Sequence, residues 1–219
     1  MFLSLLLLLT YQPPANATQR PTPERQREMW NDIYANNKMK FRAEASKFVE
    51  RAAKGRKPGR ALDLGMGTGR NTLFLAAEGW AVTGVDISDV AMQKAGESAK
   101  AADLKIAMVK QSLDEFDPGD SRWNLIVLSF MQFWVANAAP EKLTRITQGL
   151  APGGILIVEG FSKEDAPGGP QMGFATNFLW KLAQPGLRVI EYSDAKEESD
   201  WKLGTRNRVM RIVLEREPQ

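Results

Sequence analysis

The feature that most constrains the fold is a glycine-rich turn between an apolar segment and a helix-forming segment. Residues 61–71 have the sequence ALDLGMGTGRN, so Gly65, Gly67 and Gly69 follow one another at alternate positions. Glycine adopts positive φ angles without steric cost and lets a ligand approach the backbone closely. The pattern predicts a buried strand that turns sharply into a helix, with a ligand-binding loop at the turn.

Apolar segments and helix-forming segments alternate along the rest of the chain. We expect strands at residues 60–64, 81–85, 105–109, 124–129, 154–159, 187–192 and 208–215. We expect helices after Thr22, a candidate cap, and at residues 42–54, 71–78, 88–102 and 140–150. Strands separated by helices predict an α/β fold with a doubly wound, mostly parallel sheet and helices on both faces.

The amino-acid composition excludes several kinds of chemistry. The chain of 219 residues contains no cysteine and no histidine. Disulfides, thiolate nucleophiles, histidine bases and zinc sites built from these residues are therefore excluded, and we expect no metal site. The net charge is +3 and the basic residues are scattered, so we expect no nucleic-acid partner.

The N-terminal segment is expected to be separate from the fold. Residues 1–19 form a hydrophobic leader, and residues 20–219 are expected to form a single domain. The apolar run at residues 2–9 is too short to span a bilayer, and residues 15–17 have the A-x-A pattern of a cleavage site, without a preceding positive region. A signal peptide, a short membrane anchor and a misassigned start codon all stay open.

The residues around the glycine turn indicate what kind of ligand it binds. A dinucleotide fingerprint has the form G-x-G-x-x-G, and its last glycine is replaced here by Arg70. Asp63, just before the turn, would repel a pyrophosphate and attract a cationic amino group. Asp86 ends the next expected strand, 21 residues beyond Gly65, where a carboxylate can accept hydrogen bonds from both ribose hydroxyls. A zwitterionic nucleoside without phosphates fits this pattern better than a dinucleotide.

With these residues in place, the chain resembles the class I S-adenosylmethionine-dependent methyltransferases from about residue 28 to its end. Residues 61–71 are similar to their first motif, residues 82–88 to their ribose-binding motif, residues 123–129 to their fourth strand and residues 150–158 to their fifth. The Gly69-Arg70-Asn71 continuation, together with residues 30–34 and Phe41, is similar to the tellurite-resistance and thiol methyltransferase-like branch. The resemblance implies a Rossmann-like seven-stranded sheet with an antiparallel last strand, and S-adenosyl-L-methionine as cofactor.

The resemblance also implies which residues contact the cofactor. The implied set is Asp63, Gly65, Met66, Gly67, Asp86, Ile87, Leu113 and Ser129. Asp63 and Gly65 would meet the methionine portion, with Gly67 nearby, and Asp86 would hold the ribose. Ile87 and Leu113 would sandwich the adenine, while Ser129 and Phe130 would close the other side. The chain departs from the family at Ser112, where an adenine-contacting aspartate is usual.

The methyl acceptor is less constrained than the cofactor. Trp30, Tyr34 and Trp134, with the loop-rich segment 161–185, are expected to roof the substrate, and Glu159 is a candidate base. We expect a small-molecule acceptor with a soft nucleophile (a thiol, or a selenium or tellurium oxyanion), for which no catalytic base is assigned. The alternative is an O- or N-methyltransferase of a larger or membrane-soluble substrate. A cofactor-binding protein without catalysis and an oxidoreductase stay open as other classes.

The expected cellular location of the protein follows from its expected cofactor. Because S-adenosylmethionine is made in the cytoplasm, we expect a cytoplasmic or membrane-associated enzyme, with weak membrane association through the leader. Export through an N-terminal signal peptide is the alternative. The sequence leaves the oligomeric state open.

Overall fold

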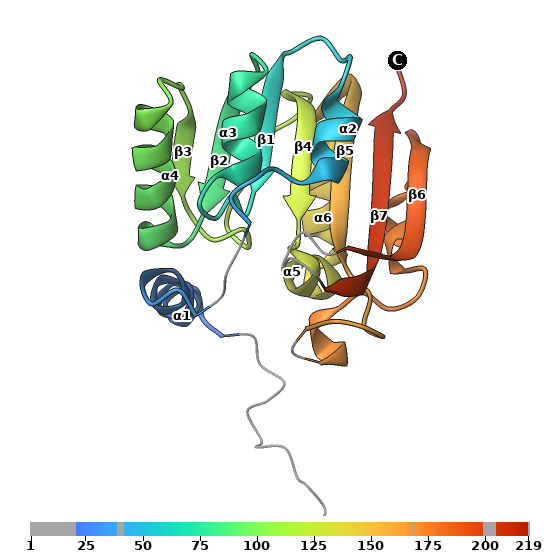
Figure 1. Cartoon of the computed structure of the whole chain (residues 1–219). Coiled ribbons are helices and arrows are strands. Elements are labelled where there is room, and N and C mark those ends of the chain that lie inside the picture. The colour runs from blue at the N-terminus through green and yellow to red at the C-terminus, as the bar shows by residue number, and fades with distance from the viewer. Residues whose placement is uncertain (1–20, 39–41, 168, 199–204, 219) are drawn as a thin grey trace, which may run out of the picture.

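The computed structural model describes residues 21–38, 42–167, 169–198 and 205–218. The expected leader at residues 1–19 lies outside these ranges. The described residues form one seven-stranded sheet with helices on both faces (Figure 1). Its strands are β1 (Arg60–Leu64), β2 (Ala81–Asp86), β3 (Ala107–Lys110), β4 (Trp123–Ser129), β5 (Leu150–Phe161), β6 (Leu187–Glu198) and β7 (Arg206–Arg216).

The strand order is β3-β2-β1-β4-β5-β7-β6. Strands β1 to β5 pair in parallel, whereas β7 is antiparallel to both of its neighbours, β5 and β6. The predicted Rossmann-like sheet with an antiparallel last strand is therefore confirmed. The chain order reverses at β1, which lies between β2 and β4, and ligands of open α/β sheets bind outside the carboxyl ends of the strands at such a point.

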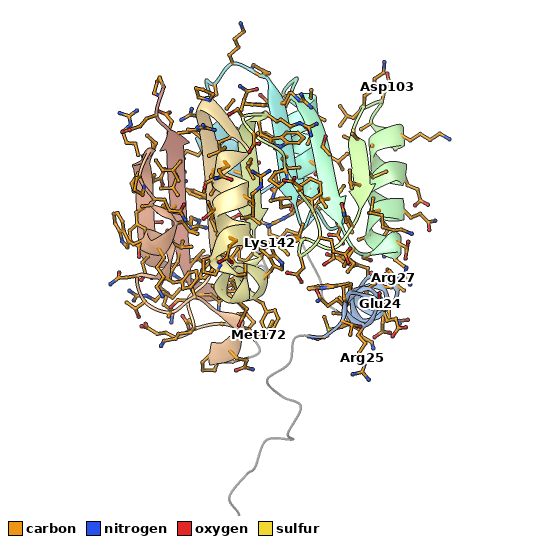
Figure 2. All side chains as sticks on the ribbon, turned by 180° about the vertical axis from the view of Figure 1, so that it is seen from behind. Glu24, Arg25, Arg27, Asp103, Lys142 and Met172 are labelled. Atoms are coloured by element: carbon orange, nitrogen blue, oxygen red, sulfur yellow. The ribbon has the colours of Figure 1, made fainter. Side chains whose placement is uncertain are left out.

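Helices cover both faces of the sheet, and α1 lies outside these two layers (Figure 1). They are α1 (Pro23–Ala35), α2 (Lys47–Ala53), α3 (Arg70–Ala77), α4 (Asp89–Ala101), α5 (Gln132–Asn137) and α6 (Pro140–Gln148). Leu125 of β4 packs in one buried cluster with Phe48 of α2 and Leu75 of α3. The next residue, Ile126, points to the opposite face and packs in a second cluster with Ile146 of α6. Figures 1 and 2 show α2 and α3 on one side of the sheet and α6 on the other.

Helix α1 lies beyond the carboxyl ends of β1 and β2 and docks on α4 (Figure 1). Asn31 of α1 accepts a hydrogen bond from the Ser88 hydroxyl over 2.7 Å, at the residue that caps α4. Lys94 of α4 donates to the backbone oxygen of Tyr34 over 2.6 Å, near the end of α1. These contacts fix the helix that carries Trp30 and Tyr34 against the edge of the sheet where a ligand is expected.

Several element boundaries differ from the predicted ones. Helix α2 begins at Lys47 and not at residue 42, because the Ser46 side chain accepts hydrogen bonds from the amides of Phe48 and Val49 and caps the helix there. The loop-rich segment 161–185 contains two 3-10 helices, Pro170–Met172 and Phe178–Leu182. Among the described residues, no helix is both long enough and apolar enough to cross a membrane.

Candidate functional site

The glycine turn forms a loop that only glycine can build easily. Gly65, Gly67 and Gly69 have φ angles of +77°, +54° and +86°, in the region that side chains disfavour. The amides of Gly65 and Met66 both donate to the backbone oxygen of Val85, over 2.8 and 3.0 Å. The loop between β1 and α3 is therefore tied to the end of β2, and its backbone faces a pocket at the carboxyl ends of the strands.

Asp86 lies where the loop and the pocket meet. Its Oδ2 accepts a hydrogen bond from the Gly67 amide and its Oδ1 accepts one from the Ser88 amide, each over 2.8 Å. Burial raises the pKa of the Asp86 carboxyl, and these amide hydrogen bonds partly oppose that rise. Asp86 lines the pocket, and each carboxylate oxygen has a further lone pair that can accept a hydroxyl.

Asp63 lies beneath the loop and is not part of the pocket wall. Its side chain is 2% exposed and accepts a 2.7 Å hydrogen bond from the Thr72 hydroxyl of α3. Burial raises the pKa of the Asp63 carboxyl to about 6, although the hydrogen bond from Thr72 and the nearby Arg70 cation lower it. Asp63 thus ties β1 to α3 and places a buried negative charge behind the loop.

The structure gathers most of the expected site residues in this one pocket. The expected residues that line it are Trp30, Tyr34, Gly65, Met66, Gly67, Asp86, Ile87, Leu113, Ser129 and Trp134. They come from α1, from the loops after β1, β2 and β3, and from the β4–α5 region. The Met66 side chain turns down onto the sheet, where a Cβ on Gly84 would lie 2.1 Å from its sulfur, so Met66 supports the loop from below.

Glu159 is not brought to the pocket wall. Its side chain is wholly buried, with Oε1 accepting a 2.7 Å hydrogen bond from the Ser129 hydroxyl. Its Oε2 accepts from Nε of Arg211 on β7 over 3.3 Å, and Arg211 is itself ion-paired with Glu197. The expected role of Glu159 as a substrate-facing base finds no support in this geometry, because both carboxylate oxygens are already engaged inside the sheet.

Arg70 was not among the expected site residues, but it lines the pocket. Its Nη2 donates to the Ser129 hydroxyl over 3.3 Å, and its guanidinium lies 5.6 Å from the centre of the Phe130 ring. Phe130 itself has a φ of +56°, a strained value of the kind found at functional sites. The sequence does contain a signal for this role, because Arg70 replaces the last glycine of the dinucleotide fingerprint. A cation at that position can bind an anionic ligand group.

The pocket wall contains two further polar side chains that the sequence does not predict as site residues. Asp114, two residues after the unusual Ser112, accepts a 2.9 Å hydrogen bond from the indole nitrogen of Trp134. Gln132, the first residue of α5, is deeply buried. Neither residue belongs to a recognisable motif, so no sequence signal identified them.

Tyr34 covers the loop from the side of α1. A Cβ on Gly67 would lie 2.7 Å from the Tyr34 hydroxyl oxygen, and the Trp30 and Tyr34 rings lie 5.9 Å apart. Burial and the neighbouring Asp86 charge raise the pKa of the Tyr34 hydroxyl. Tyr34 therefore stays protonated at neutral pH and can act as a hydrogen-bond donor. Figure 2 shows Met172, another pocket residue, at the same end of the molecule as Glu24, Arg25 and Arg27 of α1.

Comparison with known proteins finds methyltransferases that are similar to the same region of the chain. Residues 61–154 match the family described as a methyltransferase domain. The chain is 29% identical over 104 residues to YqeM of Bacillus subtilis (strain 168) and 30% identical over 103 residues to a protein of Geobacillus sp. (strain WCH70). The names of both describe candidate methyltransferases. Each match covers 46% of this chain but only 42% and 41% of the respective relatives, less than half of their length.

Solved structures share the fold at low sequence identity. TehB from Haemophilus influenzae is 18% identical with a TM-score of 0.68, over 86% of this chain and 67% of that one. The [4+2]-cyclase SpnF is 16% identical with a TM-score of 0.71, over 91% of this chain and 97% of that one. At these identities the likeness establishes the fold alone.

Proposed function

We propose that the protein is a class I S-adenosylmethionine-dependent methyltransferase that methylates a small-molecule acceptor with a soft nucleophile. The observation that carries the proposal is the arrangement of the glycine loop, Asp86 and Arg70 around one pocket. The match of residues 61–154 to a methyltransferase domain supports it, because that segment contains all three features.

The pocket residues fit the parts of this cofactor one by one. Asp86 would accept the ribose hydroxyls, and the apolar Ile87 and Leu113 would enclose the adenine. Arg70 would pair with the methionine carboxylate, while the buried charge of Asp63 would favour the amino cation. A Cβ on Gly65 would lie 2.3 Å from the sulfur of Met131, so the bare backbone leaves room for the Met131 side chain to pack against the loop.

A dinucleotide fits the same loop poorly. Arg70 stands where the third glycine of the dinucleotide motif would allow close packing, and the buried Asp63 charge behind the loop disfavours a pyrophosphate. The pocket therefore supports the methyltransferase over the oxidoreductase.

The bound cofactor would supply an activated methyl group, and the protein's part would be to align the acceptor and exclude water. Among the described residues, the titratable groups of the pocket wall are Tyr34, Arg42, Arg70, Asp86 and Asp114. The Tyr34 hydroxyl has a raised pKa, and both aspartates already accept hydrogen bonds from within the protein. None of these groups is a good general base near neutral pH, which favours an acceptor that ionises by itself, such as a thiol.

The alternative acceptor is a larger or membrane-soluble O- or N-nucleophile. The apolar side chains of the pocket wall favour it, because Phe133 is 43% exposed and lines the pocket together with Met172 and Trp30. Apolar side chains of this kind can cover the body of a hydrophobic substrate.

The release of S-adenosylhomocysteine from S-adenosylmethionine, measured over a panel of thiols, halides, selenite and phenols, tests the proposal. We expect turnover with thiols or selenite, at a rate that rises with pH along the ionisation of the acceptor and then levels off. Turnover of phenols alone would select the alternative acceptor class. A bell-shaped pH profile that does not change with the pKa of the acceptor would reveal an enzyme base.

A further inference from the structure

Ser129, Glu159 and Arg211 form a polar row across the face of the sheet that α2 and α3 cover. Ser129 of β4 lies beside Glu159 of β5, and Glu159 lies beside Arg211 of β7, in the register of the paired strands. Glu159 and Arg211 are 0% and 5% exposed. Burying an ion pair costs desolvation free energy that apolar side chains in its place would not cost, so stability alone does not account for the row. The row ends at the pocket, because Ser129 is part of the pocket wall.

The hydroxyl of Ser129 links this row to Arg70, the first residue of α3. It donates its proton to Oε1 of Glu159 over 2.7 Å and accepts a hydrogen bond from Nη2 of Arg70 over 3.3 Å. Because a carboxylate only accepts and a guanidinium only donates, the directions of both hydrogen bonds are fixed. Ser129 therefore has no proton left to donate to a ligand, and it acts on the pocket through Arg70.

The charges of the row favour a cation at the position of Arg70. Glu159 and Glu197 both pair with Arg211, so this group has two carboxylates and one guanidinium. The Arg70 cation, on the other side of Ser129, supplies the balancing positive charge. A cation at the first residue of a helix is otherwise disfavoured by the helix dipole, so the row offsets an unfavourable position.

Arg70 keeps most of its hydrogen-bonding capacity for a ligand. It lines the pocket, and it forms no ion pair with a carboxylate of the described residues. Its side chain donates to the neutral Ser129 hydroxyl and lies 5.6 Å from the centre of the Phe130 ring. A guanidinium can bind a carboxylate through two parallel hydrogen bonds, so its orientation decides how tightly it binds one.

We propose that Ser129 and Glu159 are positioning residues that orient the Arg70 guanidinium toward the carboxylate of the cofactor's methionine portion. The inference rests on the proposed function, in which Arg70 pairs with that carboxylate, and it gives the buried row a part in cofactor selection. The protein thereby distinguishes S-adenosylmethionine and S-adenosylhomocysteine from adenosyl thioethers that lack the carboxylate. Neither Ser129 nor Glu159 exchanges a proton with the cofactor or the acceptor.

A matched pair of ligands tests this role by isothermal calorimetry. S-Adenosylhomocysteine and its decarboxylated analogue differ only in the carboxylate, and both keep the amino group. The wild-type protein should bind S-adenosylhomocysteine about tenfold or more tightly than the analogue, as expected for a charge-assisted hydrogen bond. Ser129→Ala should reduce this ratio to about twofold by weakening the binding of S-adenosylhomocysteine alone. Ser98→Ala, a matched change at an exposed position of α4, should keep the wild-type ratio.

The double variant tests the part that Glu159 plays. In Glu159→Gln, the amide oxygen stays with Arg211, so the amide nitrogen turns toward the Ser129 hydroxyl and reverses the direction of that hydrogen bond. The affinity ratio should fall as it does in Ser129→Ala. Combining the two substitutions should lower the ratio no further, because Glu159 acts through Ser129. Losses that multiply in the double variant would overturn the part assigned to Glu159.

The possible outcomes separate this inference from the proposed function. An unchanged ratio in Ser129→Ala, or an equal loss of affinity for both ligands, would overturn the positioning role. A Ser129→Ala protein that does not fold, as checked by circular dichroism, would show that the hydroxyl serves the fold and would also overturn it. Equal binding of the two ligands by the wild type would remove the Arg70 contact together with the positioning role. Failure of the wild type to bind S-adenosylhomocysteine at all would overturn the proposed function itself.

Discussion

The amide of Gly67 donates a 2.8 Å hydrogen bond to Oδ2 of Asp86. This bond joins the loop after β1 to the end of β2, while the other oxygen of the same carboxylate holds the amide of Ser88, which caps α4. Asp86 therefore shapes the glycine loop and faces the pocket at the same time. Substitutions at Asp86 and in the loop should therefore disturb the loop locally and weaken ligand binding, while the rest of the fold is kept.

Replacing Asp86 with alanine should weaken S-adenosylhomocysteine binding by on the order of a hundredfold or more, because two hydrogen bonds from ribose to a charged group contribute about 1.5–3 kcal/mol each. Isothermal calorimetry measures the affinity, and circular dichroism checks that the variant is folded. Glu97→Ala, at an exposed position of α4, is the control and should bind normally. Undiminished affinity in a folded Asp86→Ala protein would remove Asp86 from the ribose site.

The variant pair Gly65→Ala and Gly55→Ala separates backbone strain from ligand contact. The two glycines have nearly equal φ angles, +77° and +75°, but a Cβ on Gly65 would lie 2.3 Å from the Met131 sulfur, whereas a Cβ on Gly55 meets nothing within 4 Å. Each substitution should cost about 1–2 kcal/mol of unfolding free energy from the left-handed conformation. Only Gly65→Ala should also reduce cofactor affinity, because the new methyl group pushes Met131 into the pocket. We expect a reduction of about tenfold or more, which corresponds to the loss of about one contact. Similar affinities of the two variants would contradict the assignment of the loop.

The loop and Asp86 could be predicted from the sequence because their signals are local. Glycines at alternate positions after an apolar strand specify positive φ angles within a few residues, and the next strand places Asp86 at the same edge of the sheet. The alternation of strands and helices likewise predicted the sheet and its two covered faces. These features depend on neighbours in the chain and only weakly on distant packing.

The side-chain partners around β4 and β5 could not be predicted in the same way. Glu159 stands in an otherwise apolar strand, and its burial depends on Arg211 of β7, 52 residues away. The unpartnered oxygen of Gln132 and the space left by Gly160 follow from the packing of α5 on β5. Contacts of this kind arise only when distant strands are placed side by side, so no local pattern encodes them.

The buried carboxyl of Asp63 should make stability depend on pH. Burial raises the pKa of this carboxyl from the ordinary 3.8 to about 6. The neutral carboxyl therefore makes its full contribution to the stability of the folded state below pH 3.8. This contribution is lost as the pH rises through 6. Asp63→Asn keeps an acceptor for Thr72 and stays neutral at every pH. The variant should therefore exceed the wild type in unfolding free energy by up to about 3 kcal/mol at pH 8 and should match it near pH 4.

Urea unfolding at the two pH values measures this difference. Asp103→Asn, at an exposed turn, is the matched control and should show no comparable dependence on pH. If the difference between Asp63→Asn and the wild type is the same at pH 4 and pH 8, then the buried charge is not the source of the effect.

Glu159→Gln should damage stability more than chemistry. The substitution leaves the buried Arg211 with only its ion pair to the partly exposed Glu197, and breaking a buried pair costs about 3–5 kcal/mol when no second partner remains. We therefore expect a loss of about 2–4 kcal/mol in unfolding free energy and only a modest fall in kcat. The control Glu191→Gln breaks an exposed pair with Arg51 and should change stability by less than about 1 kcal/mol. A fall of several orders of magnitude in kcat, with the fold intact, would mean that Glu159 acts as a base after all.

The most direct test of the central claim is calorimetric titration of the wild-type protein with S-adenosylmethionine, S-adenosylhomocysteine and NADPH under one set of conditions. The glycine loop, Asp86 and the Arg70 cation predict that the first two ligands bind with one-to-one stoichiometry and that NADPH does not bind measurably. Binding of NADPH, or of none of the three, would contradict the account.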